Sequence, residues 1–195
     1  MHTTFPSFIL GYHGCDEEVA EKVFAGKEGL RNSENAYDWL GSGIYFWEQN
    51  AERARLYAEE MQQRARIKVP AIVGAVIDLK NCLNLLDSSH LQLVATAYEV
   101  VLEATHIRGT PLPTNAPATG KGEDLLLRDL DCLVIQTLHT LQAERGDPEF
   151  DSVRGVFFEG AELYPNAGFR QKNHIQVCIR NPDCIKGYFR VQTEI

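Results

Sequence analysis

The sequence predicts an α+β protein made of short, largely antiparallel strands with helices between some of them. The chain has 195 residues, a length typical of one domain. Its residues are 44% hydrophobic and 24% charged, which supplies enough apolar material for a core and excludes wholesale disorder. Short apolar runs recur along the chain without the regular spacing of βαβ units. We therefore expect residues 1–195 to form a single α+β domain.

The first half of the chain predicts strands from apolar runs and helices with one apolar face. The predicted strands are 8–12, 44–47 and 71–79, and the predicted helices are 17–24 and 51–66. Asp16 and Asn50 precede the two helices, and both residue types accept hydrogen bonds from the first free amides of a helix. The segment 29–40 is rich in Asn, Ser and Asp and predicts a loop.

The second half predicts two longer helices and three strands around a proline-bearing connection. The predicted helices are 91–105 and 123–141, and the predicted strands are 154–158, 174–179 and 188–192. Between residues 107 and 123, prolines and small residues predict an exposed loop or insertion within the domain.

Charge and hydrophobicity predict a soluble, cytoplasmic protein. The 19 Lys and Arg against 27 Asp and Glu give a net charge of -8, which opposes sequence-independent attraction to nucleic acid. No apolar run approaches the roughly 20 residues that cross a bilayer, so we expect no membrane contact. Residues 1–10 lack the basic segment and cleavage site of a secretory signal. The five cysteines include no Cys-x-x-Cys pair, and we expect reduced thiols.

Several common cofactor motifs are absent. Gly120-Lys121 is followed by Gly122 where a phosphate loop needs Ser or Thr. Gly41-Ser42-Gly43 precedes a strand and not a helix, so it does not form a dinucleotide-binding turn. The six histidines are scattered without an i, i+4 pair, and we expect no metal. Cys15 has no clear neighbouring base, so we interpret it as a buried thiol.

Three short motifs remain as candidates for chemistry. They are Tyr12-His13-Gly14, Gly41-Ser42-Gly43-Ile44-Tyr45-Phe46 and His174-Ile175-Gln176. Together they resemble the ADP-ribosyltransferases of the diphtheria-toxin and poly(ADP-ribose)-polymerase type, whose signature is a His, Tyr, Glu triad. The second motif is the most specific, because Ala54 and Tyr57 follow it as in the polymerase-like pattern, with one register slip before Tyr57.

The resemblance extends to the end of the chain. Residues from Gln176 to Phe189 are similar to the last strand and tail of the family. The resemblance implies an ADP-ribosyltransferase-like fold, with split antiparallel β-sheets and flanking helices.

The resemblance also implies that NAD is the substrate and that no metal is needed. His13 would hydrogen-bond ribose hydroxyls, and the Gly14 backbone would hold the carboxamide. Tyr45 and Tyr57 would offer stacking faces to the nicotinamide ring. Glycine at position 14 lets the backbone approach a ligand without a Cβ in the way.

Gln176 departs from the family pattern, which has glutamate at this position. Glutamine keeps the hydrogen-bonding reach but brings no negative charge and cannot act as a general base. Three explanations of how the site works with glutamine at this position are open. Glu159 supplies the missing charge while Gln176 orients the ribose, or the acceptor assists the reaction itself, or the site binds NAD without turnover. We favour an active enzyme with His13, Tyr45, Gln176 and Glu159 as its catalytic residues.

Acceptor choice in the family commonly depends on the residue two before the glutamate and on the preceding loop. The matching features are His174 and the segment 159–173. The cations Arg170, Lys172 and Arg180 would suit a pyrophosphate or a nucleic-acid acceptor.

The expected function is that of an NAD-dependent ADP-ribosyltransferase that moves ADP-ribose to a protein or nucleic-acid acceptor. By analogy alone, its size suits a bacterial toxin or defence effector with an antitoxin-like partner. An NAD glycohydrolase that uses water, and an inactive NAD-binding or ADP-ribose-binding module, are the alternatives.

Overall fold

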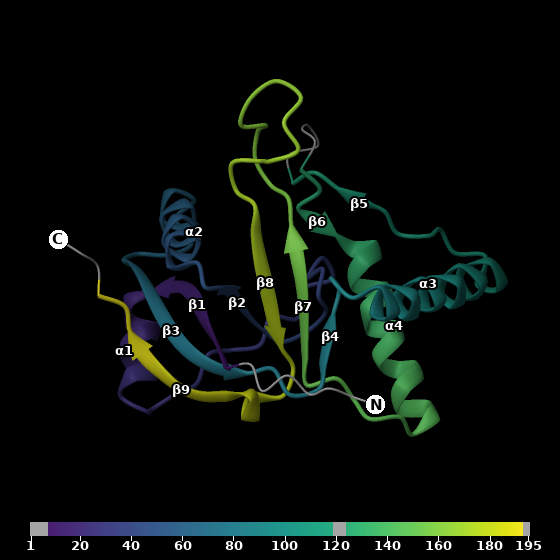
Figure 1. Ribbon diagram of the computed structural model, residues 1–195, viewed down its shortest axis with the longest axis horizontal. Coiled ribbons are helices and arrows are strands. Elements are labelled where there is room, and N and C mark those ends of the chain that lie inside the picture. The colour runs from purple at the N-terminus through teal and green to yellow at the C-terminus, as the bar shows by residue number, and fades with distance from the viewer. Residues whose placement is uncertain (1–7, 119–123, 193–195) are drawn as a thin grey trace.

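The structure is a computed structural model that describes residues 8–118 and 124–192. Its centre is a seven-stranded β-sheet with the strand order β4-β7-β8-β2-β1-β3-β9 (Figure 1). These strands are β1 (Phe8–Asp16), β2 (Ile44–Glu48), β3 (Pro70–Asp78), β4 (Cys82–Asn84), β7 (Ser152–Phe157), β8 (His174–Ile179) and β9 (Ile185–Arg190). Neighbouring strands are antiparallel except for the parallel pair β4 and β7. Two further strands, β5 (Asn115–Ala116) and β6 (Leu127–Arg128), pair separately.

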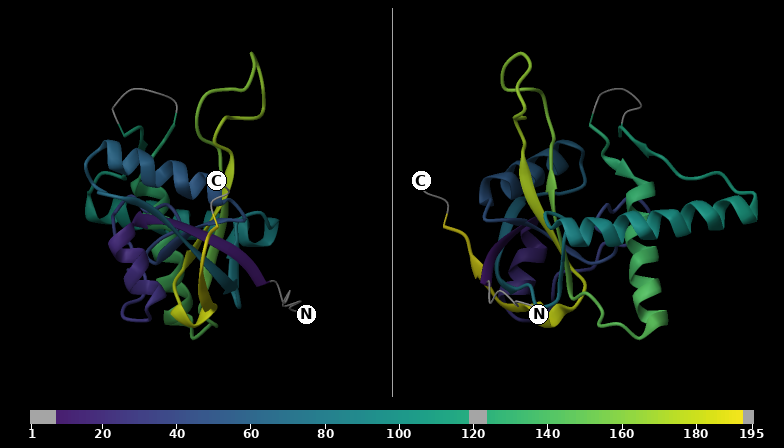
Figure 2. Two further views of the ribbon diagram at one scale, coloured as in Figure 1. Left: turned by 90° about the vertical axis from the view of Figure 1, so that its left-hand side faces the viewer. Right: turned by 45° about the vertical axis from the view of Figure 1, so that its right-hand side comes forward.

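Helices cover both faces of the large sheet. They are α1 (Glu17–Phe24), α2 (Ala51–Gln63), α3 (Ser88–Arg108) and α4 (Asp129–Arg145). One core cluster packs Ala20 and Val23 of α1 against Phe46 and Val73 of the sheet. A second cluster packs α3 and α4 against the β4–β7–β8 part of the sheet. Figure 2 shows α3 crossing α4 and extending away from the sheet.

The β1–β2 pairing is the shortest junction in the centre of the sheet. β1 pairs with β3 at nine positions, from Phe8–Asp78 to Asp16–Pro70. In contrast, β1 pairs with β2 only at Gly11–Glu48 and Tyr12–Trp47. The sheet therefore consists of two well-paired parts, β9-β3-β1 and β2-β8-β7-β4, that are joined by two residue pairs.

The observed mixture of strands and helices agrees with the predicted α+β class. Asp16 caps α1 by accepting a hydrogen bond from the Glu18 amide, and Asn50 caps α2 through the Arg53 amide, so both predicted caps are confirmed. All five cysteines are free thiols in the structure. Among the described residues, no helix has the length and apolarity needed to cross a membrane.

The structure corrects several expectations about the fold. The sheet is continuous and not split, although its central junction is short. The short strands β4, β5 and β6 were not predicted. The last strand is Ile185–Arg190, which begins three residues before the predicted 188–192.

The helix predicted at 123–141 runs instead from Asp129 to Arg145. Residues 119–123, at the end of the predicted loop, lie outside the described part of the chain. The cap of α4 comes from a distant residue, because the Asn115 side-chain oxygen accepts hydrogen bonds from the amides of Leu130 (3.1 Å) and Asp131 (3.2 Å). Such a cap leaves no local sequence signal at the start of the helix.

Candidate functional site

The early end of the β1–β2 pairing leaves part of the β1 backbone edge unpaired with β2, and we call this part the open edge. The Leu10 carbonyl accepts a hydrogen bond from the Gln49 amide (2.8 Å), so the polar backbone groups of Leu10 face β2. Alternate residues of an antiparallel strand face the same neighbour. The amide and carbonyl of Gly14 therefore face β2 as well, two residues beyond the last paired position, Tyr12–Trp47. One backbone donor and one backbone acceptor of Gly14, a buried residue, are thus directed toward β2 beyond the last paired position.

Gly14 also lets α2 lie directly on β1. A Cβ built on Gly14 would overlap the carbonyl oxygen of Ala54 and would lie 3.3 Å from the Ala58 side chain. Because the nearest atom belongs to the helix backbone, it cannot move without displacing α2. Glycine at this position therefore fixes the distance between the helix that carries Tyr57 and the open edge of β1.

His13 links the two separating strands. Its Nδ1 lies 2.8 Å from the carbonyl oxygen of Tyr45, and since a carbonyl only accepts, Nδ1 carries the proton. The imidazole ring lies edge-on to Phe46, with ring centroids 5.9 Å apart. Burial lowers the pKa of His13, an effect that the hydrogen bond to Tyr45 partly offsets. The ring is therefore neutral at pH 7.

The hydroxyl of Tyr45 has a structural role, because it makes two hydrogen bonds to the backbone. Its hydroxyl donates to the Gly41 carbonyl (2.7 Å) and accepts from the Leu40 amide (3.1 Å). Burial raises the pKa of this phenol above its ordinary value. The Tyr45 hydroxyl thus holds the turn at Gly41 in place, and the ring packs against the second core cluster.

Gln176 lies in β8 between Trp47 of β2 and Gly155 of β7. Its Oε1 accepts a hydrogen bond from the Trp39 indole nitrogen (2.8 Å). Because an indole N–H only donates, this contact fixes the orientation of the amide and leaves its NH2 group on the other side. Trp39 reaches this position because residue 155 is glycine, where a Cβ would lie 2.9 Å from the indole ring.

Aromatic rings surround Gln176, and we call these five residues the aromatic cluster. They are Trp39, Trp47, Tyr57, Phe157 and His174. Ring centroids lie 5.0 Å apart for Trp47–Tyr57 and 5.0 Å apart for Trp39–Phe157. His174 stacks on Phe157 at 5.1 Å and lies 6.3 Å from Trp47. The cluster connects α2 to β2, β7 and β8 on the face of the sheet that carries Gln176.

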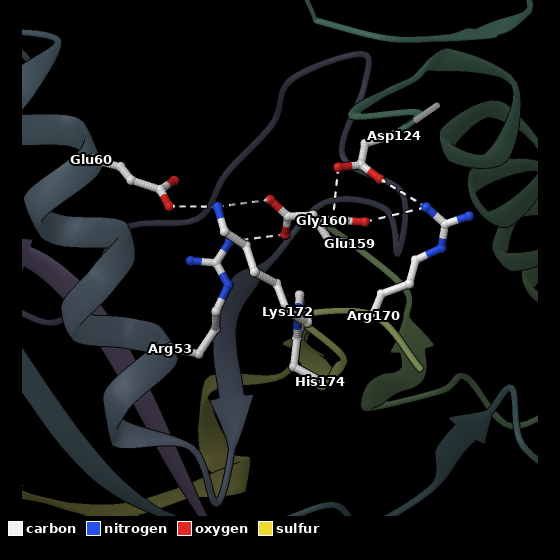
Figure 3. Close-up of polar contacts among 8 residues, drawn as sticks. All are labelled: Arg53, Glu60, Asp124, Glu159, Gly160, Arg170, Lys172 and His174. Atoms are coloured by element: carbon white, nitrogen blue, oxygen red, sulfur yellow. Dashed lines mark hydrogen bonds and ion pairs between the residues drawn. The ribbon is translucent and has the colours of Figure 1, made fainter. Parts of the chain in front are cut away.

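A buried ion pair borders the aromatic cluster (Figure 3). Arg53 Nη2 lies 2.9 Å from Glu159 Oε2, and their side chains are only 7% and 10% exposed. Lys172 Nζ lies 2.7 Å from Glu60 Oε1 and 3.8 Å from Glu159 Oε1. The Glu159 carboxylate, predicted to supply charge to the reaction, is therefore neutralised by two cations of the same chain.

The segment between β7 and β8 is held from both sides (Figure 3). On one side, Glu159 and Lys172 contact α2 through Arg53 and Glu60. On the other side, Asp124 Oδ2 accepts a hydrogen bond from the Gly160 amide (2.9 Å). These contacts fix the base of a segment that projects beyond the sheet (Figure 1).

Several buried polar atoms near this ion pair have no partner among the described residues. They are Trp47 Nε1, Arg53 Nε, Arg53 Nη1, Asn173 Oδ1 and His174 Nε2. Buried polar groups without a partner are uncommon in folded proteins and usually mark a site for water or a ligand. Both donors and acceptors are present, so the site suits a neutral polar group.

The predicted site residues thus fall into two groups, one at the open edge of β1 and one around Trp47. His13 and Gly14 lie at the open edge of β1, where His13 contacts the backbone of Tyr45 and not its ring. Tyr57 and Gln176 are joined through Trp47, which faces Gln176 across the β2–β8 ladder.

The predicted basic patch has contacts within the chain. Lys172 contacts Glu60, Arg170 Nη1 donates to the Gly160 carbonyl (3.2 Å), and Arg180 Nη1 donates to the Phe150 carbonyl (2.6 Å). These contacts argue against the sequence-based assignment of the three cations to a phosphate-binding surface. Within residues 8–118 and 124–192, no group of three or more His, Cys, Asp or Glu side chains is arranged to hold a metal ion.

Sequence reasoning did not identify Trp39, Trp47 or Arg53 as parts of the site. Arg53 lies on the charged side of a predicted amphipathic helix, where exposure is the usual expectation. Its partner Glu159 is 106 residues away in the chain, and Trp39 is 137 residues from Gln176. Contacts at such separations leave no periodic signal in a single sequence.

No protein-family model and no solved structure matches the chain. The chain is similar to the uncharacterized protein MJ0359 of Methanocaldococcus jannaschii, with 27% identity over 192 residues that cover 90% of this chain and 83% of that protein. This name describes no activity, so the chemistry of the site has to be derived from its residues.

Replacement of Gly14 by alanine should loosen the contact between α2 and β1. We expect Gly14→Ala to lower the free energy of unfolding by about 1–3 kcal/mol, the usual cost of overpacking. Gly187→Ala is the matched control, because a Cβ at this strand position meets no atom within 4 Å. Urea denaturation measures both. Equal stability of the two variants would contradict the packing described for Gly14.

Replacement of Arg53 should leave a buried, partly compensated carboxylate. We expect Arg53→Met to cost about 3–5 kcal/mol of unfolding free energy, the range for breaking a buried pair. The double variant Arg53→Met/Glu159→Gln should be more stable than Arg53→Met alone, because it removes the buried charge that Lys172 compensates only in part. Arg55→Met, two residues away in an exposed ion pair with Glu52, should cost far less. Equal losses for Arg53→Met and Arg55→Met in urea denaturation would contradict this interpretation.

Proposed function

We propose that this protein is an NAD-dependent ADP-ribosyltransferase with an ADP-ribosyltransferase-like fold. The observation that carries the proposal is the open backbone edge at Gly14, beside α2, where β1 and β2 separate after Tyr12–Trp47. The short β1–β2 junction within the continuous sheet supports the proposal, because the motif resemblance implies a sheet that divides into two halves. His13 lies on β1 and Tyr57 on α2, whereas Gln176 lies on β8, which β2 separates from β1.

The Gly14 edge is complementary to a carboxamide. Nicotinamide presents a carbonyl acceptor and an NH2 donor, and the Gly14 backbone offers one N–H and one C=O toward the same space. Tyr57, held by Trp47, supplies an aromatic face for the pyridine ring. The neutral His13 ring is suited to bind a ribose hydroxyl.

Gln176 is suited to position the ribose. Trp39 occupies its amide oxygen, so the NH2 group is available to donate to a ribose hydroxyl oxygen. This hydrogen bond orients the sugar but adds no charge and accepts no proton. Stabilisation of the oxocarbenium-like state then depends on geometry, and the paired Glu159 does not supply it directly.

The reaction breaks the bond between ribose C1′ and the nicotinamide nitrogen. The electron pair of this bond leaves with nicotinamide, and the positive charge spreads over C1′ and the ring oxygen of the ribose. An acceptor then forms a bond to C1′ and loses its proton. NAD is a substrate in this scheme, the acceptor is a macromolecule of the cell, and a role as a cytoplasmic toxin or defence effector with an antitoxin-like partner belongs to the same proposal.

A non-catalytic NAD-binding module is the second candidate function. Two observations favour it, namely the uncharged Gln176 and the pairing of Glu159 with Arg53. Such a module would bind NAD at the same edge without releasing nicotinamide. An NAD glycohydrolase would carry out the same bond cleavage with water as the acceptor.

Nicotinamide release from labelled NAD separates these functions. We expect the wild-type protein to release nicotinamide and to transfer label to an acceptor in cell lysate, and Gln176→Leu to lose most of this release because the ribose is no longer positioned. Gln92→Leu, on the exposed side of α3, is the control for glutamine replacement. Release without transfer would indicate the glycohydrolase, and NAD binding without release would exclude both enzymes.

A further inference from the structure

Helix α3 is only partly covered by the rest of the chain. The structure describes all 21 of its residues, and only Ala97 and Val101 among them are buried. The helix crosses α4 and extends away from the sheet (Figure 2). Leu91 and Leu102 of this helix are 48% and 41% exposed. A helix of a soluble protein usually turns its apolar side toward a core, so these exposed leucines indicate a surface that a partner covers.

The exposed leucines belong to a regular row of residues, which we call the α3 face. Successive members of the row are separated by four, four, three, four and four residues, so they share one side of the helix. They are Asp87, Leu91, Ala95, Tyr98, Leu102 and His106. Asp87 caps the helix by accepting a hydrogen bond from the Ser89 amide. Tyr98 is half-buried against the second core cluster, and the other five residues are exposed.

The α3 face is complementary to a second copy of itself. Its spacings are the same in both directions along the helix, so an antiparallel copy can lie on it in register. In this register Leu91 lies opposite Leu102 of the second copy, and the small Ala95 lies opposite the large Tyr98. Small residues that face large ones allow two helices to pack closely. Both copies make the same contacts, as a twofold axis requires.

Charges at the ends of the α3 face favour the antiparallel arrangement. The first turn begins at Asp87, whereas the last turn carries the basic residues His106 and Arg108. An antiparallel copy therefore brings the Asp87 carboxylate to the basic last turn, and the helix dipoles oppose each other favourably. A parallel copy would instead place Asp87 beside Asp87 of the second copy.

We infer that the α3 face is the interface of a homodimer in which α3 packs antiparallel on α3 of a second copy. The face is roughly 28 Å long, since each helical residue adds about 1.5 Å. One pair of helices lies at the small end of specific protein interfaces, so we expect a reversible dimer with a dissociation constant in the micromolar range. The dimer goes beyond the proposed function and does not depend on it, because the residues of the candidate site lie outside α3.

Sedimentation velocity of the full chain without NAD, over roughly 1 to 200 μM protein, measures this dimer. We expect the wild-type protein to change from monomer to dimer across this range. Leu102→Glu should raise the dissociation constant at least about a hundredfold, because the twofold axis buries the new charge twice. Leu93→Glu is the matched control. Leu93 is 40% exposed and lies two and a half turns from Leu102, on the opposite side of the helix, so its replacement should change the dissociation constant less than about threefold.

A mixture of two variants tests the antiparallel register. Leu91→Glu and Leu102→Lys should each be monomeric alone, because either homodimer would bury two unpaired charges. An equimolar mixture should form a heterodimer, in which the introduced glutamate faces the introduced lysine and the other pair remains leucine on leucine. A parallel arrangement would not bring the two new charges together. Urea denaturation of each variant checks that both are folded.

Three results would overturn the inference. The first is a wild-type protein that stays monomeric over the whole range, which would leave the α3 face to a different protein. The second is equal weakening of the dimer by Leu93→Glu and Leu102→Glu, and the third is a mixture of folded variants that stays monomeric. None of these measurements involves nicotinamide release, so failure of the dimer and failure of the proposed function are distinguishable.

Discussion

The two residue pairs that join β1 to β2 are the constraint on which the rest of the site depends. A longer ladder would satisfy the Gly14 backbone with β2 and leave no open edge, whereas a complete break would remove the fixed position of β1 relative to Gln176. His13 bridges the strands just beyond the last pair by its contact with the Tyr45 carbonyl. The separation is therefore held at a defined width by a side chain.

Helix α2 packs on one face of the sheet and borders the open edge of β1. Gly14 allows α2 to contact β1, and α2 in turn presents Tyr57 to Trp47 and Arg53 to Glu159. Each of these contacts joins the helix to a different strand or loop. The helix therefore couples the open edge of β1 to the aromatic cluster and to the segment that precedes β8.

Local signals account for the parts of the structure that the sequence predicts well. The capping residues Asp16 and Asn50 define the starts of α1 and α2, and the predicted bounds 174–179 are those of β8. Local signals do not predict the start of an element when the residue that caps it is distant in the chain. Asn115 caps α4 from 15 residues away, so the predicted start of that helix was wrong.

In the candidate site, too, the sequence predicts local features and misses contacts between distant residues. The motifs place His13, Gly14, Tyr45 and Gln176 on the correct strands, because each motif lies within a strand or next to one. They do not predict that the Tyr45 hydroxyl holds the Gly41 turn. Nor do they predict that Glu159 is neutralised by Arg53, since this pairing depends on how α2 packs over the sheet.

The most direct test of the account follows the Gly14 amide resonance by 15N NMR during titration with nicotinamide and with nicotinic acid. The two ligands share the ring, but only nicotinamide has the NH2 donor that complements the Gly14 carbonyl. The account predicts a saturable shift of the Gly14 resonance with nicotinamide and little or none with nicotinic acid at the same concentration. An unmoved Gly14 resonance with nicotinamide bound elsewhere, or equal shifts with both ligands, would contradict it.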